Sequence, residues 1–468
     1  MMRLDTMPYT ARPLPTGTIG LARFGLAPLG SERTRDAVET ALLADLAGYQ
    51  GKDARFGALP STRDTLIALV AKRTIARSRK AVVETGAAPL GAAKMAGLEA
   101  AANERTSLEQ ELRAGLKATR TDRTGITERL VFHWANHFTV SQDKGKVKWA
   151  IGAYPREVIR PHLLGRFEGM LFAAVTHPSM LYYLENDGSI GAGSVAGLRS
   201  GRGLNENLAR EVLELHTLGV DGGYTQADVI ALAKILSGWA VDIQPNSPTC
   251  GTTIFDPRRH EPGDKLLLGH RFTESGRDEL VEALRFLAAH PATARNVSRR
   301  LVGSFLSEPA PPAVVDTIAT SFRTTDGDLG AVTRALIGID AMWSTPPTKL
   351  RAPIELLYVA DRLLGTYPSP PTLIVAMQAM GQPFLRAPSP KGWAEEDDAW
   401  LSSDGIKSRL DWAAEIGTNA ADRFPDAVVK DAAASGALSR DTVSAIHGAE
   451  TPDQALALLL MSPELQRR

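Results

Sequence analysis

The sequence is poor in features that mark several common classes of protein. Cys250 is the only cysteine among 468 residues, which excludes an intramolecular disulfide and a thiolate-rich zinc or iron–sulfur site. Basic and acidic residues are equal in number, at 53 each. Because no overall charge attracts a polyanion, we predict that the protein does not bind nucleic acid.

Long apolar segments are also absent. The longest runs, such as ALALLLM at 455–461, fall short of the roughly 20 apolar residues that cross a bilayer. Arg3, Asp5 and Arg12 interrupt the N-terminal stretch, so it has no continuous apolar region of the kind found in secretory signals. These absences predict a soluble, cytoplasmic protein without a membrane span; export in complex with a partner is the alternative.

Strand signals are scarce, whereas helical periodicity runs through most of the chain. The best strand candidates are TTIFD at 252–256 and KLLL at 265–268, which we predict to pair as one hairpin. Apolar residues recur at helical spacing over 33–49, 61–79, 92–118, 123–138, 155–175, 205–218, 225–239, 276–289, 292–306, 311–323, 328–338, 351–363, 370–380, 405–418, 426–434, 439–447 and 451–460. We predict an all-α fold: one large multi-helix unit over 1–468, with at most one small β-hairpin and a weak subdivision near 241–276.

The segment 205–218 carries an unusual density of polar groups. On a helical wheel one arc gathers Leu208, Ala209, Val212, Leu213 and Leu215, together with Asn205 and His216. The opposite arc gathers Glu206, Asn207, Arg210, Glu214 and Thr217, with Glu211 on the rim. A charged arc usually faces solvent. In a protein of several helical layers it is covered instead, and its charges must then be paired or bind an ion.

A pair of histidines forms a second candidate cluster. His133 and His137 lie four residues apart in ERLVFHWANHFTVS, a spacing that suits two imidazoles on one metal ion. The intervening WAN lacks the Glu that H-E-x-x-H proteases use as their base. A structural role is commoner for such a pair, so metal binding is the less favoured interpretation.

The third cluster is HEPGDK at 260–265, which lies in the longest irregular stretch of the chain. Loops of this length often close over a site, although a surface turn built on Pro262 and Gly263 would have the same sequence. Neither a phosphate-binding G-x-x-x-x-G-K-[ST] nor a nucleophile elbow G-x-S-x-G is present.

Seven motifs occur in a fixed order: HWANHFTVS, HPSMLYYLEN, GLNENLAREVLELHTLGVDGGYTQADV, LSGW, HEPGDKLLLG, HPATARNVSRRL and MGQPF…APSPKGW. In this combination the chain resembles the bacterial family catalogued as domain of unknown function 1800, from about Leu21 to Trp412. The resemblance implies a single, largely helical fold. It also implies a frequent genomic pairing with a sulfatase-like protein exported by the twin-arginine route, which is a candidate partner, and it implies no particular reaction.

The family pattern falls on Trp134, Asn136, His137, Asn205, Glu206, Asn207, Arg210, Glu211, Glu214, Gly219, Tyr224, Asp228, Gly238, Trp239, His260, Lys265 and Gly269. This chain departs from it at Ala135, where many members have His, and at His216, where many have Phe. A residue that Phe replaces is not an essential ligand, so the resemblance implies a core role for His216. His133 lies outside the pattern.

The resemblance therefore favours a covered polar site over a solvated surface. We predict that its catalytic residues are His137, Arg210, Glu211 and Glu214. Asn136 and Asn207 complete the shell, and HEPGDK covers it with His260 or Lys265 pointing inward. The predicted binding residues are Trp134, Asn136, Asn205, Glu206, Asn207, Tyr224, Asp228, His260 and Lys265.

Three classes of function fit such a site. The first is an enzyme in which His137, Glu211 and Glu214 act as acid/base groups or bind a divalent ion, as in a metal-assisted hydrolase. The second is a non-catalytic partner of the sulfatase-like protein, whose polar networks only fix helix packing. The third is a module that binds a small polar molecule. We favour the second, because no complete catalytic constellation is present in the sequence.

Overall fold

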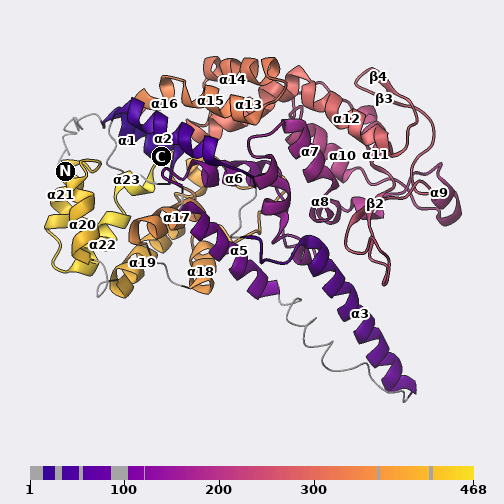
Figure 1. The fold of residues 1–468 in the computed structure, drawn as a ribbon, viewed down its shortest axis with the longest axis horizontal. Helices are drawn as coiled ribbons and strands as arrows, with labels where there is room; N and C mark the ends of the chain where they lie inside the picture. The colour runs from indigo at the N-terminus through magenta and orange to yellow at the C-terminus, as the bar shows by residue number, and fades with distance from the viewer. Residues whose placement is uncertain are drawn as a thin grey trace, which may run out of the picture.

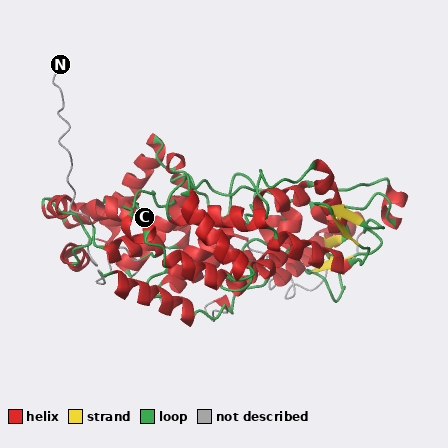
Figure 2. Ribbon diagram, turned by 90° about the horizontal axis from the view of Figure 1, so that it is seen from above, coloured by secondary structure: helices red, strands yellow, loops and turns green. Residues whose placement is uncertain are grey.

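A computed structural model describes residues 14–26, 34–51, 56–85, 104–120, 122–365, 369–420 and 425–468. Helices make up most of these ranges and strands only a small part at one end of the molecule (Figures 1 and 2), which confirms the all-α prediction. Of the predicted helix at 92–118, residues 92–103 lie outside the described ranges. No helix within these ranges combines the length and the apolar character needed to span a bilayer.

An α-helix lies in each predicted segment, within the described ranges. In the first half of the chain the α-helices are α1 (Thr16–Phe24), α2 (Arg35–Gly48), α3 (Thr62–Thr85), α5 (Glu104–Thr119), α6 (Ile126–His137), α7 (Phe167–Thr176), α8 (Pro178–Tyr183), α9 (Val195–Ser200), α10 (Asn207–Glu211) and α11 (Gln226–Leu236). The short helical turns are η2 (Val147–Trp149), η3 (Pro155–Ile159), η4 (Arg160–His162), η5 (Asn186–Gly188), η6 (Val212–His216) and η7 (Asp397–Ala399), of which η3 and η6 are π-helices.

The second half of the chain continues with α12 (Arg277–Ala289), α13 (Pro291–Phe305), α14 (Pro312–Thr324), α15 (Leu329–Ile337), α16 (Ala341–Ser344), α17 (Pro353–Leu364), α18 (Pro370–Ala379), α19 (Ser403–Ala420), α20 (Pro425–Ala434), α21 (Arg440–His447), α22 (Pro452–Leu460) and α23 (Pro463–Gln466). Many of these helices begin at a proline. The missing N–H of proline costs nothing in the first turn, and its fixed φ already suits a helix. The Pro-rich breaks in the sequence therefore start helices.

The strands form two separate antiparallel pairs. Strand β1 (Trp239–Val241) pairs with β2 (Thr253–Phe255), and β3 (Lys265–Leu267) pairs with β4 (His270–Phe272). The predicted pairing of 252–256 with 265–268 is therefore wrong, although both segments are strands. Leu268 and Gly269, with φ of 51° and 75°, form a two-residue turn of the kind that joins hairpin strands. Because of this turn, β3 pairs with β4, the strand that follows it directly.

Buried apolar side chains form two large cores and one small cluster around Phe56. The larger core runs from Leu21 to Trp343 and includes residues on both sides of 241–276. The smaller core combines α5 with the helices from α17 onward, and Figure 1 shows these C-terminal helices gathered at the left end of the molecule. Helix α6 touches both cores: Trp134 is buried in the larger one, and Phe132 packs against the smaller one.

Candidate functional site

The predicted helix at 205–218 is α-helical only over α10 and continues as the π-helix η6. A π turn adds a residue to the helical repeat and rotates the side chains that follow it. Thr217, which the wheel placed on the polar arc, is fully buried, and its hydroxyl donates to the Val212 carbonyl at 2.6 Å. Leu215, which the wheel placed on the apolar arc, is only partly buried.

Arg210 binds groups at the surface. Its Nη2 donates to Glu206 Oε2 at 3.2 Å and to Gln226 Oε1 at 2.8 Å. The Gln226 amide closes the ring by donating to Glu206 at 2.7 Å. The side chains of Arg210 and Glu206 are 42% and 36% exposed, so this ring joins α10 to α11 in contact with water.

Glu211 and Glu214 form a half-buried carboxylate pair on the same segment. Glu214 accepts a hydrogen bond from the Tyr224 hydroxyl at 3.1 Å. Burial, and then the charge of Glu214, raises the pKa of Glu211. Burial raises the pKa of Tyr183 to about 12, with the Glu211 charge as a smaller cause. Each carboxylate therefore lies near a phenol group and near the other carboxylate.

His137, the last residue of α6, is buried in the core beside the end of η6. Its Nε2 faces the His216 carbonyl at 3.1 Å, and its Nδ1 has no partner among the described residues. Its ring packs edge-on against Phe138 and Phe167. Burial lowers its pKa, so the ring is neutral. No hydrogen bond in the described structure joins His137 to the carboxylate pair, and their joint catalytic role stays a prediction.

The remaining polar residues of the segment complete backbone hydrogen bonds. Asn205 Oδ1 accepts from the Asn207 N–H at 2.9 Å at the start of α10. Asp228 and Thr225 form a capping box at the start of α11. The second oxygen of Asp228 accepts from the Leu268 N–H at 2.6 Å. Asp228 therefore ties α11 to the β3–β4 turn.

The loop HEPGDK points His260 and Lys265 inward, toward a carboxylate that the sequence did not single out. Lys265 Nζ lies 2.9 Å from Glu279 Oε2, and His260 Nε2 lies 3.2 Å from the same oxygen. His260 Nδ1 faces the Ser237 carbonyl at 2.8 Å. All three side chains are buried. This cluster attaches the loop to α12, and no hydrogen bond in the described structure joins it to Glu211.

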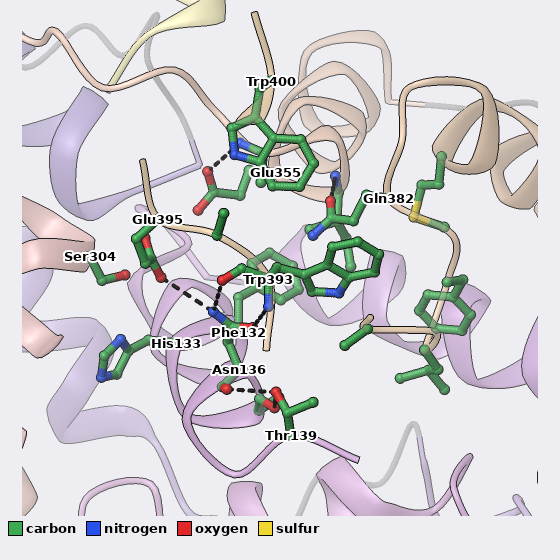
Figure 3. Close-up of a pocket in the computed structure, with 18 of the residues that line it drawn as sticks. Phe132, His133, Asn136, Thr139, Ser304, Glu355, Gln382, Trp393, Glu395 and Trp400 are labelled. Atoms are coloured by element: carbon green, nitrogen blue, oxygen red, sulfur yellow. Dashed lines mark hydrogen bonds between the residues drawn. The ribbon is translucent and has the colours of Figure 1, made fainter. Parts of the chain in front are cut away.

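Asn136 binds a segment that is distant in sequence. Its Oδ1 accepts from the Trp393 N–H at 2.7 Å, and its Nδ2 donates to the Trp393 carbonyl at 3.0 Å (Figure 3). The amide thus pairs with Trp393 as a neighbouring β-strand would. We call residues 389–395 the strap. Gly392, beside Trp393, has a φ of +89°, which a glycine adopts without steric cost.

The strap, α6 and α17 enclose a partly open pocket of about 130 Å³. Its walls are largely apolar and aromatic, with Phe132, Ile354, Phe384, Trp393 and Trp400 among them. Figure 3 shows Glu395 next to Asn136, with a dashed line joining the two side chains, and Ser304 and His133 at the same end of the pocket as Glu395. The pocket lies where the two hydrophobic cores meet, because Phe384 packs against both cores and Phe132 packs against the smaller one.

One end of the pocket is formed by ion-paired side chains. We call this cluster the charged floor: Arg129, Glu355, Glu395 and Arg468, which line the pocket, together with Lys349, which contacts Glu395. Glu355 binds Arg129 Nη1 and, at 2.8 Å, Arg468 Nε. Glu395 Oε2 lies 3.5 Å from Lys349 Nζ and 3.7 Å from Arg468 Nη2. Its pKa is lowered by the charges of Arg468 and Lys349, which outweigh the opposing effect of burial, so the carboxylate is ionised.

Several donors next to the charged floor have no partner. Arg129 Nε and Nη2 and His133 Nε2 are buried and make no hydrogen bond within the described residues. Arg129 is fully buried and His133 is 5% exposed. Burial lowers the pKa of His133 to about 3, so its imidazole is neutral. Unsatisfied buried polar groups are uncommon in folded proteins, and each requires a physical explanation.

No three His, Cys, Asp or Glu side chains lie together as potential metal ligands in the part of the chain that the structure describes. His133 and His137 have ring centroids 6.4 Å apart, and both rings pack among aromatic side chains. Cys250 is buried.

The fold and the pocket define an all-α protein with buried charges around a small cavity at the meeting point of two cores. The sequence model of the family described as "Protein of unknown function (DUF1800)" matches residues 22–467. The chain therefore belongs to this family, which confirms the resemblance seen in its motifs. No curated protein and no solved structure matches the chain.

Sequence reasoning named Asn136 but missed the charged floor. The motif MGQPF…APSPKGW contains Gln382, Phe384 and Trp393, which line the pocket, so this motif and HWANHFTVS, which holds Asn136, carried the signal for this site. Nothing local marks Arg129 or Glu355, because each lies in an ordinary helical pattern.

Proposed function

We propose that the protein binds a small molecule in the pocket between α6, α17 and the strap. The observation that carries this proposal is the charged floor, where the buried donors of Arg129 and His133 have no partner among the described residues. Ligand pockets combine apolar walls with a few convergent polar groups, and this pocket has both.

The volume of the pocket sets the size of the ligand. An apolar cavity of about 150 Å³ holds a benzene molecule, and this pocket has about 130 Å³ of comparable space. A single ring or a short chain with one polar group therefore fits. The aromatic rings of Phe132 and Trp393 provide walls for the apolar part.

Isothermal titration calorimetry with benzyl alcohol tests the proposal. For a ligand of this size we expect saturable binding with a Kd on the order of 1 mM. Ala135 is half-buried and lines the pocket on α6, so Ala135→Leu fills the space and abolishes binding. Ala173→Leu on α7 adds the same bulk to a half-buried site outside the pocket and preserves it. Absence of binding, or equal binding by both variants, refutes the proposal.

We also propose the accessory role toward a sulfatase-like exported protein, which the family resemblance suggests. One feature of the structure supports a protein partner. Val195 and Leu198, one turn apart on α9, are 53% and 77% exposed, and exposed apolar side chains favour protein contacts.

Co-purification of the full chain with the sulfatase-like protein tests this second proposal. We expect a stable complex that the double substitution Val195→Ser with Leu198→Ser weakens. Leu410→Ser, at a half-exposed site on α19, is the control and leaves the complex intact. If no complex forms, or if the α9 variant binds as well as the parent chain, the accessory role through α9 is rejected.

A further inference from the structure

The charged floor is rich in cations. Three cationic side chains belong to it, namely Arg129, Arg468 and Lys349, and Arg23 and Arg351 lie directly behind it. The positive charge of Arg468 contributes to lowering the pKa of each of the other four, although burial is the larger cause. Among the described residues, only Glu355 and Glu395 make ion-pair contacts with this group.

The two cations behind the floor bind backbone carbonyls instead of carboxylates. Arg23 donates to the carbonyls of Met342 and Thr345, the latter at 3.0 Å. Arg351 Nη2 donates to the Ala22 carbonyl at 2.9 Å. Carbonyl oxygens satisfy the donors without neutralising the charge, so the floor keeps an excess of positive charge in a poorly solvated place.

Glu395 is not free to pair with a cationic ligand. Its Oε1 accepts from Asn136 Nδ2 at 3.5 Å, and its Oε2 faces Lys349 and Arg468. A ligand cation placed beside it would stand among three protein cations, which repel it. An anion at the same place is attracted by those cations, and it finds unpartnered donors on Arg129 and His133.

The walls add a second requirement. Phe132 and Trp393 are partly exposed and face the pocket, as are Ile354 and Leu385. A simple inorganic anion would leave these apolar surfaces wet. A ligand with an apolar body covers them and gains the free energy of removing that surface from water.

On the premise of the proposed binding function, we propose that the ligand is a small apolar carboxylate. Its carboxylate lies at the charged floor beside Arg129 and His133, and its apolar body lies between Phe132 and Trp393. This assigns His133 a direct contact with the ligand, although it lies outside the family pattern and the sequence indicated a structural pair with His137 or, as the less favoured interpretation, a metal-binding pair.

Three probes of nearly equal size separate the charge preference from the binding function: benzoate, benzyl alcohol and benzylamine, measured by calorimetry on the full chain at neutral pH. Because a hydrogen bond to a charged group adds about 1.5–3 kcal/mol, we expect benzoate to bind at least about tenfold more tightly than benzyl alcohol. Benzylamine should bind most weakly.

The outcomes distinguish the two proposals. If benzyl alcohol binds as tightly as benzoate, or benzylamine binds most tightly, the carboxylate assignment is overturned while the binding function stands. If no probe binds, the binding function itself fails. Salt is a further check, since benzoate affinity should decrease with ionic strength and benzyl alcohol affinity should not.

A pair of histidine variants tests the contact directly. His133→Phe keeps the bulk of a buried ring and removes the unpartnered Nε2; we expect benzoate binding to weaken about tenfold and benzyl alcohol binding to stay within error. His216→Phe makes the same change at another fully buried histidine that does not line the pocket, and it should leave both affinities unchanged. Equal benzoate affinities for the two variants would remove His133 from the site.

Discussion

Replacing Gly392 with alanine is the sharpest test of how the strap is held over the pocket. A Cβ at this position would stand 2.4 Å from Asn136 Oδ1, 2.7 Å from the Asn136 carbonyl and 2.8 Å from Thr139 Oγ1. The carbonyl belongs to the last turn of α6 and cannot move aside. The strap must therefore shift outward, and both hydrogen bonds between Asn136 and Trp393 are lost.

The magnitude follows from two separate costs. An alanine at φ +89° costs about 1–2 kcal/mol, and two lost hydrogen bonds cost about 0.5–1.5 kcal/mol each. Gly392→Ala should therefore destabilise the protein by about 2–5 kcal/mol. Gly381 provides a matched control, because it has a φ of +87° and no atom within 4 Å of an added Cβ. Gly381→Ala should cost only the first part, about 1–2 kcal/mol.

Urea unfolding followed by tryptophan fluorescence measures the two variants, and hydrogen exchange at residues 391–395 reports the strap itself. We expect faster exchange there in Gly392→Ala and unchanged exchange in Gly381→Ala. A double-mutant cycle with Asn136→Ala should show strong coupling, since both changes break the same contact. If the two glycine variants lose equal stability, or if the cycle is additive, Asn136 does not hold the strap and this reasoning is refuted.

Three further predictions concern buried charges. Glu355→Gln leaves buried Arg129 without an ionised partner and should cost about 3–5 kcal/mol of unfolding free energy. Asp411→Asn in an exposed ion pair should cost less than about 1 kcal/mol, and similar losses for the two variants would contradict the structural assignment. Lys265→Met removes the cation beside buried Glu279 and should also cost about 3–5 kcal/mol in the same urea assay, and a neutral effect would show that the cluster does not stabilise the loop. Burial lowers the pKa of His216 to about 3, so its neutral form stabilises the fold above the unfolded pKa of about 6.5, and this contribution is lost as the pH falls toward 3. His216→Phe lacks this loss and should therefore gain about 2 kcal/mol relative to the parent at about pH 5. Urea titrations of both proteins at about pH 5 and at neutral pH measure this gain, and an unchanged pH dependence would refute the neutral core role.

The helices were predictable because their signals are local. Periodicity located every α-helix of ten or more residues in the described chain but missed α1 at Thr16–Phe24, and prolines such as Pro291 and Pro312 mark where helices begin. The capping box of Thr225 and Asp228 is likewise contained within four positions of sequence. These patterns depend only on neighbours one turn apart, so one sequence suffices to read them.

Two structural features were not predicted from the sequence, because they depend on departures from regular geometry. The π-helix at 212–216 changes the phase of the wheel, so Leu215 and Thr217 exchanged their expected environments. The strand at 253–255 turned back to pair with 239–241, because the segment at 265–267 already had a partner across Leu268 and Gly269. Neither the extra residue per turn nor the choice between two strand partners has a local sequence signature of its own.

The pocket was not predicted for a different reason: the residues that form it are far apart in the sequence. Asn136 and Trp393 are 257 positions apart, and Arg129 and Glu355 are 226 apart. Charged residues at such distances look like ordinary solvated positions on separate helices. Only the packing of α6 against α17 and the strap places them in one buried group.

The type of a polar residue did not show whether it stabilises the fold or lines the pocket. Asn205, Asp228 and Lys265 are polar and match the family pattern, yet each has its partners within the fold: a backbone N–H, a capping box or a buried carboxylate. A buried polar group with its partners in place recovers most of the free energy that its desolvation costs. Arg129 is paired with Glu355 through Nη1, but its Nε and Nη2 and the Nε2 of His133 have no partner among the described residues, and a buried polar group without a partner costs about 1–3 kcal/mol. If the protein binds a ligand as proposed, the ligand offsets this cost, and unsatisfied polar atoms beside a cavity are then a better guide to the site than residue type alone.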